Sequence, residues 1–322
     1  MADFDVFNGD ADGICALTQL RLAAPHDAVL VTGVKRDIEL LRRVPTGAAA
    51  CVTVLDVSLD KNRSDVLRLL EAGVEIFYVD HHFAGEIPEG AGFKAIINEA
   101  SDVCTSLLVN GYLKNRYLAW AVTGAFGDNL AKSAEILAQQ LELSEVKLRQ
   151  LEKLGTYLNY NGYGESVEDL HFAPDALFRL VSRHESPFAF IADGREHFER
   201  LEYGYTDDMA KAAAITLAPG SADQSALVVL PNEPWARRVS GVYSNDLTNQ
   251  YPDRAHAVLT EKGNGRYLVS VRAPLSRKKG ADTLCRRFET GGGRAAAAGI
   301  NDLPEAELPR FIAEFSHHVW GA

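Results

Sequence analysis

The stretch Glu75-Ile76-Phe77-Tyr78-Val79-Asp80-His81-His82 decides how the rest of the chain is interpreted. Its apolar first part predicts a buried parallel strand, and its last three residues follow at the carboxyl end of that strand. Open α/β sheets bind ligands at this end, and imidazoles and carboxylates are ligands of divalent transition metals. Taken alone, the triplet is more typical of one packed and one solvated histidine. The metal interpretation therefore depends on the neighbouring segments.

Other predicted turns carry carboxylates as well. They are Asn8-Gly9-Asp10-Ala11-Asp12-Gly13 after the strand 4–7, Asp56 after the strand 50–55, and Asp128 in the turn 124–129, which we expect to interrupt a helix. In the first of these turns, alternate spacing can point three oxygens to one side. The alternative there is that Asp12 caps the following helix and Asp10 only forms the turn.

Strands and helices alternate along the first part of the chain. We predict strands at 4–7, 28–32, 50–55, 75–79 and 95–97, and helices at 14–22, 37–43, 59–70, 101–113, 117–122, 133–158 and 174–181. This alternation is typical of an α/β fold with a doubly wound parallel sheet. We expect this domain to span residues 1–200 and to be followed by a linker at 201–225.

A smaller α/β domain is predicted for residues 226–322. We expect strands at 226–230, 255–259 and 267–272, with a hairpin turn at 263–265, and helices at 241–251 and 281–288. The stretch Gly291-Gly292-Gly293-Arg294 comes next, followed by alanines 295–298 and Gly299. Glycines let backbone N–H groups approach an oxyanion, so we expect a phosphate-binding loop with a helix behind it. The alternative is a plain flexible loop.

Charge is unevenly spread along the 322 residues, whose formal net charge is −11. Residues 226–322 hold 13 lysines and arginines against 10 acidic residues, which leaves 20 against 34 in residues 1–225. An acidic part with clustered carboxylates can bind cations, and a mildly basic part can bind an anionic substrate. The overall negative charge argues against binding of long nucleic acid.

Targeting features are not evident in the sequence. No run of about 18 apolar residues predicts a membrane span, and the acidic N-terminal stretch does not resemble a signal peptide. The 4 cysteines are scattered without a C-x-x-C pair, so we expect free thiols in a cytoplasmic protein.

With these motifs in place, the chain resembles the DHH/DHHA1 phosphoesterase superfamily along nearly its whole length. The Asn8–Gly13 turn resembles the first motif, Asp56 the second, Asp80-His81-His82 the third and Gly127-Asp128 the fourth. In the C-terminal domain, Gly291–Gly299 resembles the glycine-rich motif of the family, and Ser270-Val271-Arg272 resembles its substrate-contacting strand.

The resemblance implies hydrolysis of phosphodiester or phosphoanhydride bonds with two divalent ions, commonly Mn²⁺, with Mg²⁺ or Co²⁺ as substitutes. The implied ligands are Asn8, Asp10 and Asp56 for one ion, and Asp12, Asp56, His81 and Asp128 for the other. His82 would contact the scissile phosphate, and Asp80 would orient a neighbour. Arg272, Gly291, Gly292, Gly293 and Arg294 would bind the substrate, which would lie in a cleft between the two domains.

Two positions depart from the pattern of many family members, which have histidine in place of Asn8 and of Arg294. An amide oxygen is a weaker metal ligand than an imidazole, whereas arginine binds phosphate in a bidentate manner. The asparagine form is similar to phosphodiesterases that act on the linear dinucleotide pGpG. The domain sizes resemble those of short-oligonucleotide phosphodiesterases more than those of the larger RecJ-type exonucleases.

The expected function is hydrolysis of very short RNA or linear dinucleotides, such as pGpG in cyclic-di-GMP turnover, to mononucleotides. One alternative is a phosphatase acting on 3′-phosphoadenosine 5′-phosphate. Another is a nucleotide-binding sensor with a decayed site. The expected partner is a short oligonucleotide or dinucleotide. We expect binding neither to long nucleic acid nor to a membrane, and a homodimer is one possible oligomeric state.

Overall fold

A computed structural model of the chain describes residues 2–221 and 223–321. The chain divides into two compact units, of which the first ends at Tyr203 and the second begins at Gly204. The predicted linker at 201–225 thus starts within helix α9 (Arg195–Ala213), which spans the division. Each unit is described by itself.

The first unit is built on a five-stranded parallel sheet with the order β2-β1-β3-β4-β5. Its strands are β1 (Ala2–Phe7), β2 (Val29–Val31), β3 (Ala49–Leu55), β4 (Glu75–Asp80) and β5 (Phe93–Ile97). This order confirms the predicted doubly wound sheet. In such a sheet the ligand crevice lies where the strand order reverses, here at the carboxyl ends of β1 and β3.

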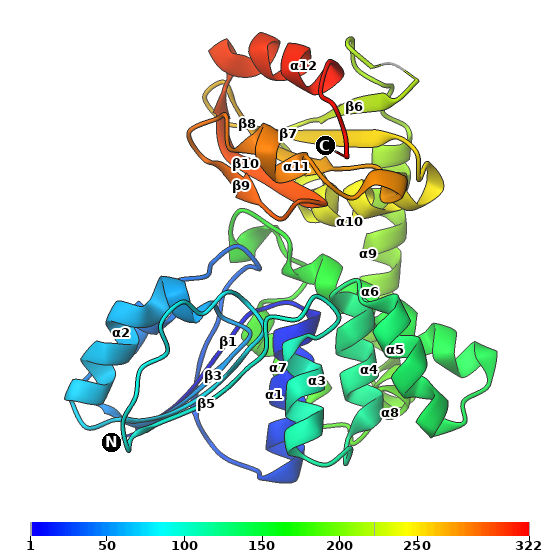
Figure 1. Cartoon of the computed structure of the whole chain (residues 1–322). Coiled ribbons are helices and arrows are strands. Elements are labelled where there is room, and N and C mark those ends of the chain that lie inside the picture. The colour runs from blue at the N-terminus through cyan, green and yellow to red at the C-terminus, as the bar shows by residue number, and fades with distance from the viewer. Residues whose placement is uncertain (1, 222, 322) are drawn as a thin grey trace. The chain divides into compact units, whose positions relative to one another are not determined.

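Helices cover both faces of this sheet (Figure 1). Besides α9, the helices of this unit are α1 (Ala11–Ala23), α2 (Leu59–Glu71), α3 (Thr105–Tyr112), α4 (Leu118–Gly127), α5 (Ala131–Ala138), α6 (Glu145–Gly162), α7 (Pro174–Val181) and α8 (Pro187–Asp193). Helix α2 lies on one face, where its Val66 and Leu69 share an apolar core with Val54 and Tyr78 of the sheet. Helices α1, α3 and α4 lie on the other face, so the turn after β1 enters a helix of this side.

The helix predicted at 37–43 is wrong, because only a short 3-10 turn, η1 (Leu41–Arg43), forms there. The Leu41 amide donates to the Asn62 side chain of α2, at 3.2 Å, instead of to a helical carbonyl. Asp37 pairs with Arg43 across the same segment. Side-chain contacts therefore stabilise this segment in an irregular conformation, although its apolar residues had indicated a regular helix.

The turn predicted at 124–129 is only partly confirmed, because α4 continues through Gly127 and the turn is limited to Asp128, the C-terminal cap, and Asn129. The glycines serve close helix packing instead of ending the helix. A Cβ atom at Gly124 would lie 2.3 Å from Ser106 Oγ of α3, and one at Gly127 would lie 2.3 Å from Ala11 Cβ of α1. The close contacts bring the end of α4, with Asp128, to the turn that follows β1.

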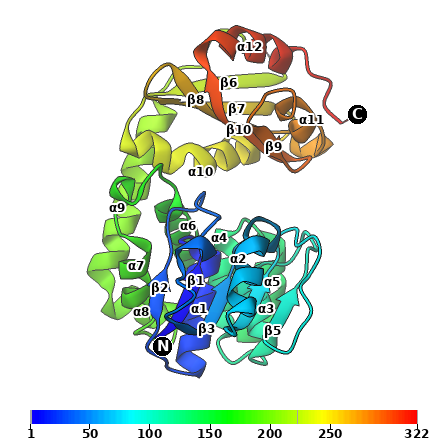
Figure 2. The ribbon, with the colours of Figure 1, turned by 90° about the vertical axis from the view of Figure 1, so that its left-hand side faces the viewer.

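The second unit holds a mixed five-stranded sheet with the order β6-β7-β8-β10-β9. Its strands are β6 (Ser225–Leu230), β7 (Ala255–Lys262), β8 (Arg266–Arg272), β9 (Gly291–Gly293) and β10 (Ala297–Pro304). Helix α10 (Pro234–Gln250) covers one face, and α11 (Ala281–Cys285) and α12 (Leu308–Ser316) cover the other (Figure 2). The predicted β7–β8 hairpin is confirmed.

The helix predicted behind the glycine-rich stretch is wrong. Gly291–Gly293 forms strand β9, and the alanine-rich segment enters β10, its antiparallel partner. Helix propensity is overridden because β10 fills the position between β8 and β9. Gly299 permits this close pairing, since a Cβ atom there would lie 2.6 Å from Val269 O of β8. The stretch is therefore an edge hairpin.

No helix in the described part of the chain is both long and apolar enough to cross a membrane.

Candidate metal centre

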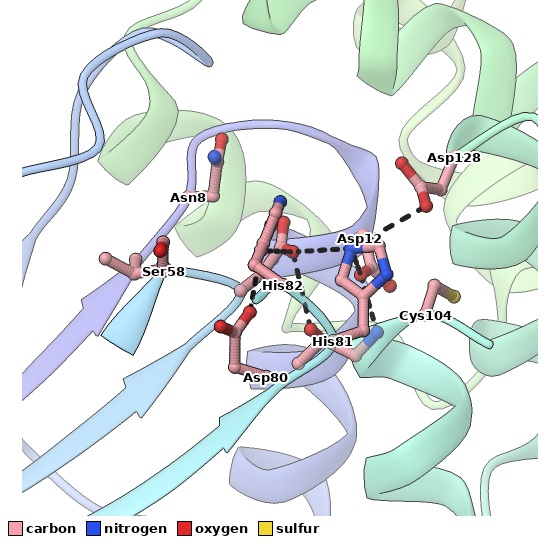
Figure 3. Close-up of polar contacts among 12 residues, drawn as sticks. Asn8, Asp12, Ser58, Asp80, His81, His82, Cys104 and Asp128 are labelled. Carbon is pink, nitrogen blue, oxygen red and sulfur yellow. Dashed lines mark hydrogen bonds and ion pairs between the residues drawn. The ribbon is translucent and has the colours of Figure 1, made fainter. Parts of the chain in front are cut away.

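Side chains from four separate segments meet at the carboxyl edge of the first sheet. They are Asn8, Asp10 and Asp12 after β1, Asp56 after β3, Asp80, His81 and His82 at the end of β4, and Asp128 at the end of α4. All except His82 and Asp128 are buried. Figure 3 shows His81 facing Asp12 and Asp128, with His82 beside it.

His81 lies at the centre of the cluster. Its Nδ1 is 3.0 Å from the Val103 carbonyl oxygen, which can only accept, so Nδ1 carries a proton. In the neutral ring, the lone pair is then on Nε2, the form that binds a metal. This atom faces three carboxylates, with Asp56 Oδ1 at 3.4 Å, Asp128 Oδ2 at 3.8 Å and Asp12 Oδ2 at 4.0 Å.

Asp56 is held in a strained backbone conformation. Its φ of 58° is in the left-handed region, which a residue with a side chain adopts only where its surroundings enforce it. Burial raises the pKa of Asp56 well above its usual value, and the carboxylates of Asp10 and Asp12 raise it further. A cation among these groups would relieve that repulsion.

The first turn places its two carboxylates differently. Asp10 caps α1, because its Oδ1 accepts from the N–H groups of Asp12 and Gly13. Asp12 instead points to α3, where it accepts from the N–H groups of Thr105 and Ser106, both at 2.7 Å. Asp12 thus caps α3, a helix distant in sequence. These two hydrogen bonds fix the Asp12 oxygen that faces His81.

Asp80 and His82 form a pair at the end of β4. Asp80 is fully buried, and its Oδ1 lies 2.7 Å from His82 Nδ1. The His82 side chain is 37% exposed, so the ring spans from the buried carboxylate towards solvent. Asp80 therefore orients the more accessible of the two histidines.

Lys35 belongs to this cluster, although sequence reasoning missed it. It lies in an irregular segment after β2, and its ammonium contacts Asp10 Oδ2 at 2.5 Å and Asn159 Oδ1 at 2.8 Å. Burial alone lowers the pKa of Lys35, but Asp10, Tyr163 and Asp128 together raise it well above its usual value. Its position after another parallel strand of the same sheet was the available signal.

Lys35 also affects the titration of the carboxylates. Burial raises the pKa of Asp10, but the charge and hydrogen bond of Lys35, with the Gly13 N–H, outweigh it and lower the pKa. Burial raises the pKa of Asp128 to about 6, although Lys35 acts in the opposite direction. Groups of the protein itself therefore compensate the charge of Asp10, whereas burial prevails at Asp128.

The donor set fits a divalent metal. Within the described residues, ligand atoms of Asp12, His81 and Asp128, and likewise of Asp56, His81 and His82, lie close enough to share one ion. Asn8 Oδ1 is buried and lacks a hydrogen-bond partner among residues 2–221 and 223–321, as expected of an atom that awaits a ligand. Carboxylate oxygens with imidazole nitrogens suit Mn²⁺ and related ions.

The predicted substrate residues lie in the second unit. Arg272 ends β8 and pairs in register with Ala297, which exchanges two backbone hydrogen bonds with Arg294. The two arginines therefore belong to the same end of the second sheet. Arg272 Nε donates to Asn245 of α10 at 2.8 Å, whereas Arg294 is exposed next to Gly291, Gly292 and Gly293.

The sequence matches no protein-family model and no curated protein. The fold matches that of RecJ exonuclease bound to manganese with a TM-score of 0.62 at 19% identity, covering 98% of this chain and 89% of that chain. RecJ from Thermus thermophilus in complex with Mn²⁺ gives a TM-score of 0.60 at 19% identity, covering 98% of this chain and 51% of that chain. An exopolyphosphatase-related protein from Bacteroides fragilis gives 0.51 at 14% identity, covering 98% and 92%. These likenesses establish the fold.

The chain covers 89% of one RecJ structure and 51% of the RecJ structure from Thermus thermophilus. The expected similarity in size to the short-oligonucleotide phosphodiesterases stays a prediction.

Proposed function

We propose that the protein is a metal-dependent hydrolase of phosphoester bonds. The observation that carries this proposal is the environment of His81, whose lone-pair nitrogen faces Asp12, Asp56 and Asp128 at 3.4–4.0 Å. Three carboxylates around one imidazole nitrogen repel one another, and a divalent cation among them would relieve that repulsion. The fold likeness to RecJ supports the same conclusion, since two of those structures hold manganese.

Two divalent ions, preferably Mn²⁺, would neutralise the phosphate and lower the pKa of the attacking water. We assign Asp12, Asp56, His81 and Asp128 to one ion, and Asn8, Asp10 and Asp56 to the other. Asp80 holds His82 so that its other ring nitrogen can contact the scissile phosphate or the leaving oxygen. The buried position of Asp80 keeps that orientation fixed.

We further propose that the substrate is a very short RNA or a linear dinucleotide such as pGpG. The excess of acidic residues in the first 225 positions is unsuited to a long polyanion. Exposed Arg294 and the β9–β10 hairpin offer a local site for one phosphate. Such a substrate needs few contacts outside the metal centre.

A turnover panel in Mn²⁺ tests this function. The substrates are pGpG, mixed dinucleotides, a five-nucleotide RNA and 3′-phosphoadenosine 5′-phosphate, with Asp56→Ala as the inactive control. We expect mononucleotides from the dinucleotides, no turnover in chelator, and loss of both turnover and bound Mn²⁺ in Asp56→Ala. Preference for the monoester would establish the phosphatase instead. Nucleotide binding without turnover of any substrate would indicate a sensor.

A further inference from the structure

Lys35 places a fixed positive charge within the metal centre. Its ammonium contacts Asp10 Oδ2 at 2.5 Å and Asn159 Oδ1 at 2.8 Å, and Asp128 Oδ1 lies 3.9 Å away. Its side chain is 23% exposed, and that of Asp10 is 3% exposed. The charge therefore lies among groups that the proposed function assigns to metal ions.

The backbone of Lys35 is fixed as firmly as its side chain. Its N–H donates to the Gly162 carbonyl at 2.7 Å, and its own carbonyl accepts from Asn8 Nδ2 at 3.2 Å. Gly162 also permits the close approach of Asp10, because a Cβ atom there would lie 3.0 Å from Asp10 Cβ. Both the backbone and the ammonium group of Lys35 are thus held by hydrogen bonds, unlike those of a flexible surface lysine.

The two proposed ion positions differ in their relation to this charge. Asp10 is the carboxylate that distinguishes one position, and both of its oxygens already accept hydrogen bonds, Oδ1 from the turn and Oδ2 from Lys35. An ion at Asp10 must displace the ammonium or lie beside it. At the other position, Asp12, His81 and Asp128 present ligand atoms close to one another, and the contact of Lys35 with Asp128 is longer.

We propose that Lys35 competes with a divalent ion for Asp10, so that the two positions fill in order. The position of Asp12, His81 and Asp128 binds its ion first and tightly. The position of Asn8 and Asp10 binds its ion weakly, because the ammonium must leave Asp10 before the carboxylate can coordinate. This inference rests on the proposed metal dependence and adds Lys35 as the residue that sets the second affinity.

Titration of the metal-free full chain with Mn²⁺, followed by calorimetry and by the electron paramagnetic resonance of free Mn²⁺, tests the proposal without reference to activity. We expect two binding steps in the wild type, separated by at least about tenfold in affinity. Lys35→Met retains the length of the side chain without its charge, and should strengthen the second step by at least about tenfold. Lys35→Arg retains the charge and should keep the steps apart. Lys153→Met, at an exposed lysine of the same unit, should match the wild type.

Two equal steps in the wild type would overturn this inference and leave the proposed function intact. A second step that Lys35→Met does not strengthen would also overturn it, and would mean that Lys35 only neutralises Asp10. Absence of any Mn²⁺ binding would overturn the proposed function together with the inference. If Lys35→Met fails to fold, Lys35→Gln, which is also neutral, takes its place, and the second step should be strengthened in the same way.

Discussion

Asp80 Oδ1 lies 2.7 Å from His82 Nδ1, and the carboxylate is fully buried while the imidazole is 37% exposed. This relationship gives the two residues different roles, although they are neighbours in one motif. A buried carboxylate that accepts from Nδ1 fixes the ring orientation and leaves Nε2 as the reactive nitrogen. Asp80 therefore orients the ring, and in the proposed function His82 is the group that would touch the substrate.

Asp80→Asn should lower kcat on a chromogenic phosphodiester by roughly 10- to 100-fold, which corresponds to about 1.4–3 kcal/mol. The amide has the shape of the carboxylate but lacks its charge, and it can turn its NH₂ group towards the ring. Because Asp80 is not an assigned ligand, Mn²⁺ affinity should stay within about threefold of the wild type. A parallel loss of Mn²⁺ binding would show that Asp80 acts through the metals instead of through His82.

Asp128→Asn should weaken the first Mn²⁺ step and reduce turnover by more than about 100-fold. The residue caps α4 with its side chain 20% exposed, so the change removes little apolar packing. It does remove one of the carboxylates that face His81 Nε2. Calorimetric titration and initial rates provide the measurement, with Asp65→Asn on α2 as the control. Turnover within about tenfold of the wild type would contradict the ligand role.

The sequence allowed the first sheet to be predicted because its strands are short apolar runs separated by amphipathic helices. The motifs after β1, β3 and β4 then followed from the rule that parallel strands end at one edge. The structure brings Asp128 close to His81, as expected, but Gly124 and Gly127 had indicated a turn where α4 in fact continues. Only the packing of α4 on α1 and α3 reveals that these glycines allow helix contact.

Other features depend mainly on long-range contacts. Lys35 joins the site through Asp10, Asn159 and Gly162, which lie up to 127 positions away in sequence. The alanine-rich segment of β10 has the composition of a helix, and its strand conformation results from pairing with β8 and β9. Spacing alone could not predict either of these features.

The stability of the second unit should depend on pH through His256 of β7. Burial and the nearby Arg254 lower the pKa of His256 to about 4. The unfolded chain, with a histidine pKa of about 6.5, binds the proton first as the pH falls. Stability is therefore lost between about pH 6.5 and 4, by roughly 2–3 kcal/mol at pH 4.5.

His256→Leu should remove this loss, because the unfolded chain then gains no proton at that position. Urea unfolding, with pulsed hydrogen exchange of the β7 amides at pH 7.5 and 4.5, measures the difference. His317→Gln, at an exposed histidine of the same unit, is the control. An equal acid-induced loss in His256→Leu and in the wild type would exclude His256 as the cause.

Arg294→Ala tests whether the second unit binds substrate. If its guanidinium binds a phosphate remote from the scissile bond, the binding energy of this contact helps to position the reacting phosphate for attack. The change should lower kcat/KM for dinucleotides by about 10- to 150-fold, equivalent to roughly 1.5–3 kcal/mol for a hydrogen bond to a charged group. A small chromogenic phosphodiester lacks the remote phosphate, so its turnover should fall by less than about threefold.

Arg286→Ala removes another exposed arginine of the same unit and should leave both substrates unaffected. A substrate-length series completes the test, because a single remote contact favours dinucleotides over chains of five or more nucleotides. Initial rates with each substrate in excess Mn²⁺ provide the comparison. Equal losses on the dinucleotide and the chromogenic substrate would mean that Arg294 acts on the fold or on the metals. A wild-type preference for long RNA would mean that Arg294 does not set the preferred substrate length. A single contact with one phosphate adds no binding energy for additional nucleotides.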